Sequence, residues 1–237
     1  MKKVLVSYAD GSLYKQLQQQ SIQTATNINC FNDIYTLGRE CINEKFYSNN
    51  RSILDSKRGA GYWLWKPYIV DRMLKLLEYG DILMYADTAI RFTANLEPIF
   101  NIVQTSEHGM WYSSFTDHTH TTWTKKKTFE ILDCTDEIFI TGEKKFMSSA
   151  QVFAVKKNDF VIKFIQEWLH YCCIEDCITD KILGDNYPDF KDHRHDQSIL
   201  SLLLCRHDIK TYHIATQYGN STRPSNYLYD QLMHDVH

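Results

Sequence analysis

A helical segment that leads directly into a buried strand is the feature that most constrains the fold. Within Pro67–Tyr79 the apolar residues recur at helical spacing, and the proline suits a first turn, where its missing N–H has no partner to lose. Gly80 is a natural stop, and the apolar run Ile82–Ala86 follows before ending abruptly at Asp87. Such an uninterrupted run is typical of a strand covered on both faces by helices. The order predicts a βαβ-type unit with a locally parallel sheet.

The rest of the chain alternates between strand-like and helix-like segments. No Pro/Gly/Ser-rich linker divides it and no internal repeat is visible, so its 237 residues fit one core. We therefore expect one three-layer α/β domain over residues 1–237, with the polar tail 216–237 as a loop that can move. Predicted strands are Val4–Tyr8, Met110–Phe115, Ala150–Val155 and Ile209–Ile214; predicted helices are Leu13–Ile22, Ile34–Phe46, Lys125–Leu132, Asn158–Cys173 and Ser198–Cys205; Ser48–Asp55 is predicted to be a polar loop.

Composition and charge exclude several classes of protein. A hydrophobic fraction of 43% is too high for a disordered chain, and a net charge of -3 argues against a nucleic-acid partner, since phosphate binding needs a surplus of Lys and Arg. The first residues hold too short an apolar run for a signal peptide, and no stretch approaches the ~20 apolar residues of a membrane span. With seven cysteines, an odd number, we expect reduced thiols in the cytoplasm.

Several reactive-looking clusters favour structural interpretations. The three cysteines within residues 172–177 are expected to be buried helix cysteines, because a structural zinc site needs four convergent donors. His118, His120 and Lys125–Lys127 are expected to be solvated surface. The chain has no Walker A loop, GxGxxG fingerprint, GxSxG elbow or HExxH motif, so nucleoside triphosphatase, dinucleotide-enzyme, hydrolase and metalloprotease interpretations lack support.

Polar residues follow two of the predicted strands. In open α/β sheets, ligands bind beyond the carboxyl ends of the strands, where loops converge. Residues 8–10 end the first strand, and Asp87 and Thr88 follow the run Ile82–Ala86. A carboxylate at the end of an apolar run can hold a divalent cation, or it can cap the next turn through nearby backbone N–H groups. Asp87 alone leaves both interpretations open.

Two further segments carry polar groups at predicted helix starts. Residues 192–198 hold two imidazoles, two carboxylates, an arginine and an amide, which is more than a helix cap needs and favours a phosphate-ester or glycosyl site. Residues 57–67 combine two glycines, several aromatic rings and the cations Arg58 and Lys66 beside a helix start, which suits an anion. For Trp63 and Trp65 individually, packing at the helix entry is the simpler role.

Three segments together resemble a known family. RGAGYWLWKPY, GDILMYADTA and HRHDQSILSLL, in this order, are similar to small GT-A-fold nucleotide-sugar glycosyltransferases of bacterial surface-polysaccharide gene sets and large DNA viruses. The family includes the amino-terminal sugar-transferring domain of an algal-virus enzyme, and the similarity runs from Val4 to about His213. It implies a three-layer GT-A-like fold with a mixed, mostly parallel central sheet.

The resemblance also implies chemistry and roles. It implies transfer of a sugar from a nucleoside diphosphate-sugar, UDP-linked, to a glycan or glycoconjugate acceptor, with Mn²⁺ or Mg²⁺ on the diphosphate. Asp196 is the candidate catalytic base if the enzyme inverts the anomeric centre. The implied donor-binding residues are Tyr8, Ala9, Asp10, Arg58, Gly61, Lys66, Asp87, Thr88, His193, His195 and Gln197.

The aspartate motif departs from the family pattern. The family commonly reads Tyr-x-Asp-Ala-Gly at this strand end, whereas this chain reads Tyr85–Ala89 as YADTA, without the glycine or a second aspartate. A metal held through Asp87 then needs a second protein ligand, and His193 or His213 is the expected one. Two rivals remain at this point: a non-catalytic sugar-nucleotide or glycan-binding domain on the same fold, and a structural protein in which residues 192–198 only cap a helix.

Overall fold

The centre of the protein is a mixed five-stranded sheet. The computed structural model describes residues 1–216 and 228–236. The sheet has the order β2-β1-β3-β8-β5. Its strands are β1 (Lys3–Tyr8), β2 (Asp33–Leu37), β3 (Ile82–Ala86), β5 (Met110–Trp111) and β8 (Val152–Lys156). Strand β1 pairs parallel with β2 and β3, whereas β8 runs antiparallel to β3 and β5. The expected mixed sheet, parallel around β1, is therefore confirmed.

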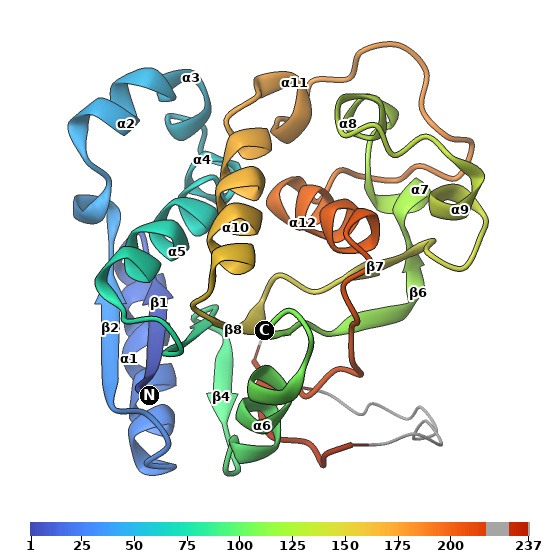
Figure 1. Cartoon of the computed structure of the whole chain (residues 1–237). Helices are drawn as coiled ribbons and strands as arrows, with labels where there is room; N and C mark the ends of the chain where they lie inside the picture. Colours follow the sequence, from blue (N-terminus) through green and yellow to red (C-terminus); the bar gives the residue numbers. More distant parts are fainter. Residues whose placement is uncertain (217–227, 237) are drawn as a thin grey trace.

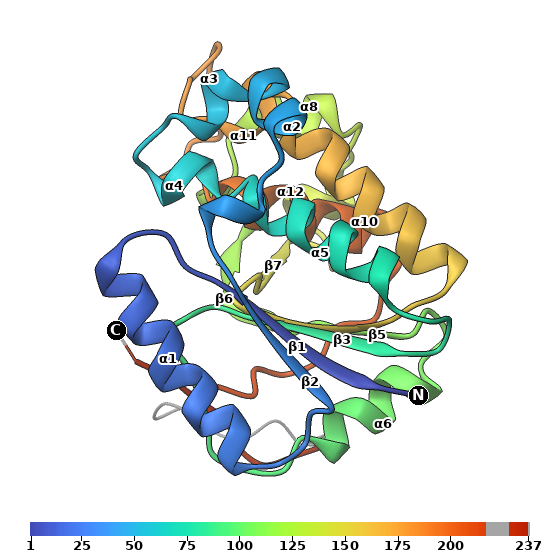
Figure 2. The ribbon, with the colours of Figure 1, turned by 90° about the vertical axis from the view of Figure 1, so that its left-hand side faces the viewer.

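Helices cover both faces of this sheet and give three layers (Figures 1 and 2). Figure 2 shows α1 and α6 on one face, and α5, α10 and α12 on the other. These helices are α1 (Ser12–Asn27), α5 (Trp65–Leu76), α6 (Glu97–Thr105), α10 (Asp159–Cys172) and α12 (His195–Arg206). Within the described residues, none of the helices is at once long enough and apolar enough to cross a bilayer.

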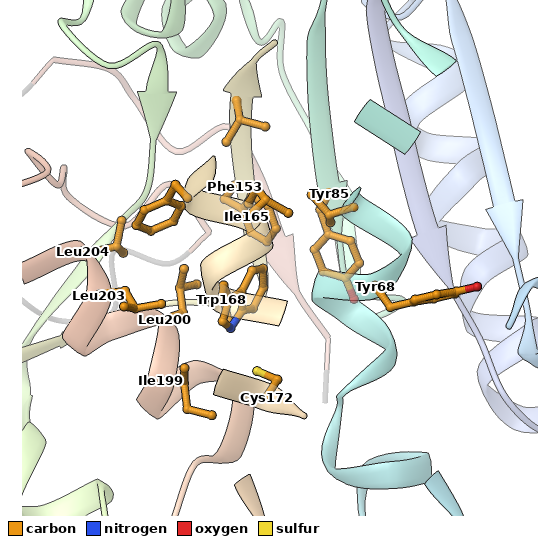
Figure 3. Close-up of a cluster of buried hydrophobic side chains, with 14 of the residues drawn as sticks. Tyr68, Tyr85, Phe153, Ile165, Trp168, Cys172, Ile199, Leu200, Leu203 and Leu204 are labelled. Carbon is orange, nitrogen blue, oxygen red and sulfur yellow. The ribbon is translucent and has the colours of Figure 1, made fainter. Parts of the chain in front are cut away.

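Strand β3 is apolar throughout because it feeds a separate core on each face of the sheet. Leu83 and Tyr85 belong to the cluster beneath α5, α10 and α12, while Ile82 and Met84 belong to the cluster beneath α1 and α6. Alternate side chains of a strand point to opposite faces, so both sets must be apolar. Figure 3 shows the first cluster, in which Trp168 of α10 lies close to residues of α12.

Short elements fill the space around the sheet. Two small antiparallel pairs form: β4 (Ile90–Phe92) with β9 (Met233–Asp235), and β6 (Ser114–Thr119) with β7 (Phe146–Ser148). The short helices are η1 (Arg39–Cys41), α2 (Glu44–Asn49), α3 (Arg51–Leu54), α4 (Gly59–Tyr62), α7 (His120–Trp123), α8 (Lys126–Ile131), α9 (Glu137–Ile140) and α11 (Glu175–Ile178). The pair β4–β9 matters for function because it returns the C-terminal segment to the end of β3.

Two expectations for residues 34–55 are wrong. Residues 34–46 do not form one helix: Asp33–Leu37 is the edge strand β2, and α2 begins only at Glu44, where the Asn43 side chain accepts the Phe46 N–H at 2.8 Å. Pairing with β1 overrides the local helical pattern there. The expected polar loop at 48–55 also contains α3, whose Ile53 and Leu54 are buried in the core.

Other boundaries also differ from expectation. The strand expected at Ile209–Ile214 does not form, and Tyr212 makes only an isolated bridge to Ser113. The strand expected at Met110–Phe115 is divided between β5 and β6. The remaining expected strands and helices are present with shifted ends. The loop expected over residues 216–237 falls partly on 217–227 and 237, which lie outside the described residues.

Candidate functional site

A buried lysine joins the two carboxylates that the sequence singled out. Lys66 Nζ lies 3.4 Å from Asp87 Oδ1 and 3.3 Å from Asp196 Oδ2, and it donates a hydrogen bond to the Ala150 carbonyl at 3.0 Å. The lysine side chain is only 3% exposed. An ammonium group buried this deeply needs opposite charge and hydrogen-bond acceptors, and here it has two carboxylates within ion-pair distance and one carbonyl acceptor. Asp87 and Asp196 therefore meet at one edge of the sheet.

Three different elements bring these groups together. Asp87 directly follows β3, where its N–H donates to the Gln151 carbonyl at 2.8 Å. Lys66 lies in the first turn of α5 and Asp196 in the first turn of α12. The residue before Asp196, His195, has a left-handed φ of 51° at the start of its helix. Backbone strain of this kind persists only where the surroundings hold it, and it often marks a functional site.

The three charges affect one another strongly. Burial by itself lowers the pKa of Lys66, but the negative charges of Asp196 and Asp87 outweigh it, so the lysine pKa is raised. Burial raises the pKa of Asp196 to about 6; Lys66 opposes this shift and Asp87 adds to it. The Tyr85 hydroxyl donates to Asp87 Oδ1. One positive charge thus faces two carboxylates, and the cluster is short of positive charge.

A cavity of about 610 Å³ opens beside Asp87. It joins the ends of β1 and β3, where the sequence predicts a ligand site. Its walls include Tyr8, Ala9, Asp10, Trp63, Trp65 and Thr88. Tyr8 and Trp65 stack with ring centroids 4.0 Å apart, so one wall of the cavity is aromatic. The volume lies within the range of ligand sites in proteins.

The turn of α4 forms another wall of this cavity. Ala60 and Trp63 have φ values of 51° and 59°, which are strained for residues with side chains. Gly61 has φ 103°, and a Cβ there would lie 2.8 Å from Leu54 Cα. Close packing on α3 explains why this position is a glycine, whereas the sequence predicts that Gly61 contacts the sugar-nucleotide donor. Gly61 is buried and is not among the residues that line the cavity.

Arg58 holds the α4 turn in place. Its guanidinium lies 2.9 Å from Asp180 and 2.5 Å from Asp192. Its charge is therefore already paired with two carboxylates, and Arg58 is not among the cavity-lining residues. Arg58 thus connects the α4 turn to Asp180 and Asp192. The neighbouring residue Lys57 lines the cavity instead.

His193 and His195 point into the protein. His193 Nε2 donates to the Cys177 carbonyl at 2.9 Å, and its Nδ1 accepts the Lys125 N–H at 3.4 Å. His195 Nδ1 lies 2.8 Å from the Ile178 carbonyl, and its ring stacks on Trp63 at 5.4 Å. Neither histidine lines the cavity beside Asp87. The structure therefore places both as supports of the surrounding backbone.

The expected metal ligands do not come together. His213 packs against Tyr229 with ring centroids 4.0 Å apart, and its Nε2 lies 3.2 Å from the Tyr229 carbonyl. Across residues 1–216 and 228–236, no three His, Cys, Asp or Glu side chains are placed to share an ion. The set Asp87, His193 and His213 is thus not assembled. Asp87, 27% exposed beside the cavity, still suits a Mg²⁺-type ion that one carboxylate and substrate phosphates hold together.

A second, smaller cavity of about 260 Å³ adjoins the first. Gln151 lines both cavities, so the two share this residue as part of their walls. Gln197, which the sequence pointed to, lines the second cavity. Its other walls include Phe115, His118, Ser149, Arg194 and Asp235. Sequence reasoning missed Asp235, because it stands in a polar tail where no motif or spacing marks it.

Two residues that were expected to be solvated are buried. Lys125 is 1% exposed, and its Nζ donates to the carbonyls of Thr179 and Lys181. Burial lowers the pKa of Lys125 to about 8. His120 is fully buried and meets the ring of Phe129 edge-on. Both positions are enclosed by long-range packing, which the local sequence does not show. All seven cysteines are free thiols. Cys172 and Cys177 are buried in the core as expected, whereas Cys173 is only half-buried.

The buried histidines make stability depend on pH. Burial lowers the pKa of His120 to about 3 and of His195 to about 4, and lowers that of His193 well below its usual value. Below pH ~6.5 the unfolded chain binds these protons and the folded chain does not, so stability is present above that pH and is lost as pH falls. His120 and His195 are each expected to cost about 2 kcal/mol of stability at pH 5.

His120→Gln tests this sign directly. In urea unfolding, the wild type is expected to lose about 2 kcal/mol more than the variant between pH 7.5 and pH 5, because groups such as Asp196 contribute equally to both proteins. An equal loss in both proteins would show that His120 is protonated in the folded state.

Comparisons with known proteins yield distant structural likenesses. No protein-family model matches the chain, and no curated protein matches it significantly. The apo-form glycosyltransferase GlyE of Streptococcus pneumoniae TIGR4 matches 90% of this chain at 14% identity, with a TM-score of 0.47. The chain spans 46% of that protein's length. Mouse xyloside xylosyltransferase 1, also in an apo form, matches 89% of this chain and 84% of its own at 8% identity, with a TM-score of 0.49.

Proposed function

We propose that this chain is a glycosyltransferase that moves a sugar from a nucleoside diphosphate-sugar, a UDP-sugar, to a hydroxyl of a glycan acceptor. The observation that carries the proposal is the junction of Lys66, Asp87 and Asp196 beside a cavity of about 610 Å³. The cavity combines the stacked rings of Tyr8 and Trp65, which suit a nucleobase, with polar groups at the ends of two strands. The motif resemblance in the sequence points the same way.

The donor is proposed to lie along the cavity. Tyr8, Ala9 and Asp10 at the end of β1 would receive the uracil and ribose, and Asp87 and Thr88 at the end of β3 would face the diphosphate. Mn²⁺ or Mg²⁺, held by Asp87 together with the diphosphate, would neutralise charge on the leaving group. This accounts for a carboxylate at a site that must accept an anion.

The protein's own residues would position the reaction. Glycosyl transfer passes through an oxocarbenium-like centre while the nucleoside diphosphate leaves, so alignment of donor and acceptor is essential. Lys66 fixes Asp87 through a buried ion pair, and Tyr85 fixes the same carboxylate through a hydrogen bond. Arg58 fixes the α4 turn that closes one wall. These contacts preorganise the site before a ligand arrives.

A non-catalytic sugar-nucleotide or glycan-binding domain is the second candidate. One observation favours it: the described residues offer no group of three metal-capable side chains. Turnover separates the two candidates. Release of UDP from any UDP-sugar, with a glycan or water as acceptor, supports the enzyme; tight UDP binding without release supports the binding domain.

Ligand binding is expected to require nucleotide and metal together. A UDP-sugar at about 100 times its Kd with Mn²⁺ adds about 2.7 kcal/mol, which corresponds to a rise in melting temperature of about 5–10 °C. Mn²⁺ alone is expected to change the melting temperature little, because Asp87 lines the cavity and its cluster partner Asp196 does not. Thermal-shift and calorimetric screening of UDP-, GDP- and TDP-sugars, with and without Mn²⁺, measures this.

Control ligands in the same screen distinguish the proposed function from its alternatives. GDP- and TDP-sugars test whether the base is selected. No shift with any nucleotide-sugar would contradict the proposed function and favour a structural protein, and an equal shift with Mn²⁺ alone would contradict the shared metal site.

A further inference from the structure

Asp235 lies across Gln151 from Asp87. The Gln151 side-chain amide donates to Asp235 Oδ2 at 3.0 Å, while the Gln151 carbonyl accepts the Asp87 N–H at 2.8 Å. The pair β4–β9 fixes this arrangement, because Asp235 is the register partner of Ile90 and the next residue donates to the Ala89 carbonyl at 3.0 Å. One glutamine therefore connects the end of β3 with a carboxylate on the last strand.

Asp235 and Asp196 differ in what they can reach. Asp235 is half-buried and lines the second cavity. The Asp196 side chain is 4% exposed, is paired with Lys66, and is not among the residues lining either cavity. A general base must come within hydrogen-bond reach of the proton that it removes. Of these two residues, only Asp235 is among those that line a cavity able to hold a substrate hydroxyl.

The second cavity has the chemistry of a sugar site. Phe115 and His118 lie with ring centroids 4.6 Å apart and ring planes tilted by 32°, and such aromatic rings can pack against the C–H groups of a sugar. Arg194, Gln197 and Ser149 supply donors and acceptors for hydroxyl groups. Because Gln151 borders both cavities, a molecule here would lie next to one bound beside Asp87.

We propose that the second cavity binds the carbohydrate acceptor and that Asp235 is the catalytic base, an assignment that rests on the proposed glycosyltransferase function. The acceptor oxygen attacks the anomeric carbon of the donor and forms the new C–O bond. The bond between the anomeric carbon and the diphosphate oxygen breaks, and the diphosphate leaves with its electron pair. The hydroxyl proton passes to the Asp235 carboxylate. Attack from the side opposite the leaving group inverts the anomeric configuration.

In this assignment Asp196 keeps a different role. Its carboxylate balances the charge of Lys66 and so holds Asp87 in place, which makes Asp196 a positioning residue. Gln151 positions Asp235 by donating a hydrogen bond from its side-chain amide to Asp235 Oδ2 at 3.0 Å.

The test compares donor binding with turnover. UDP release from UDP-hexoses is measured with water and with p-nitrophenyl glycosides as acceptors, in the wild type, Asp235→Asn and Asp235→Glu. Asp235→Asn is expected to slow release about 100-fold or more, as for loss of a general base, while its Kd for UDP changes less than threefold. Asp235→Glu is expected to keep more activity than Asp235→Asn. Asp230→Asn, an exposed aspartate of the same segment, is the matched control and is expected to stay within twofold of the wild type.

The stereochemistry gives an independent readout. An α-linked UDP-hexose is expected to yield a β-configured product, observed by NMR before mutarotation. A loss below tenfold in Asp235→Asn with UDP binding intact, or a product of retained configuration, would overturn the assignment and leave the proposed function standing. If the wild type binds no UDP-sugar or turns none over, the proposed function itself fails, and this base fails with it.

Discussion

Replacing Lys66 by methionine is expected to lower the free energy of unfolding by about 3–5 kcal/mol, the usual cost of removing one partner from a buried ion pair. The ammonium group is the positive charge that contacts both Asp87 and Asp196, and the lysine side chain is 3% exposed. Its loss leaves two carboxylates facing each other at the start of α5. Urea unfolding at pH 7.5, with circular dichroism and fluorescence as two probes, measures the change.

Two further variants make this result specific. Lys57→Met removes a neighbouring cation that lines the cavity from an exposed position, and it is expected to change stability by less than about 0.5 kcal/mol. The double variant Lys66→Met with Asp196→Asn removes one of the two stranded charges and is expected to recover part of the loss, because contacting residues are not additive. If Lys66→Met is as stable as the wild type, the buried cluster does not exist as described.

Local patterns were sufficient where one element determines its own burial. The apolar run Ile82–Ala86 and the periodic segment before it predicted β3 and α5, because burial on both faces needs a continuous apolar strand. The cap at Asn158 was equally local, since its side chain accepts the Val161 N–H three residues away. These signals lie within one stretch of sequence.

Patterns failed where a distant segment decides the structure. Asp33–Leu37 became a strand because β1 offers it a parallel edge, and its own residues are half-buried or exposed. Residues 209–214 lost their expected strand because only Tyr212 finds a partner. Such outcomes depend on long-range pairing, which single-sequence periodicity does not report.

The candidate site shows the same division. Asp87, Lys66 and Asp196 were identified because a strand end and two helix starts place side chains at the edge of a sheet. The roles of His193 and Arg58 could not be predicted. The sequence does not show that His193 faces the Cys177 carbonyl, or that Arg58 is paired with two carboxylates. Asp235 was missed altogether, since its position depends on the return of the chain to β4.

Asp87→Asn is expected to reduce turnover of a UDP-sugar by about 100-fold to 1000-fold, the usual cost of one preorganised electrostatic group at a reacting centre. The fold should remain intact, because the change leaves Lys66 and Asp196 as a one-to-one ion pair and removes the surplus negative charge. This contrasts with Lys66→Met, which leaves the surplus behind. In Asp87→Asn, UDP release at saturating donor is therefore expected to fall while the stability measured by urea unfolding is kept.

The metal dependence of Asp87→Asn separates two roles for this carboxylate. If Asp87 shares an ion with the diphosphate, the variant needs far more Mn²⁺ for half-maximal turnover and stays slow at saturation, because an amide oxygen is a weaker ligand than a carboxylate. Asp33→Asn, an exposed aspartate on β2 that pairs with Lys2, is the matched control and should behave as the wild type. Wild-type turnover of Asp87→Asn at saturating Mn²⁺ would remove Asp87 from the reaction. The buried cluster would then serve only to hold β3, α5 and α12 together.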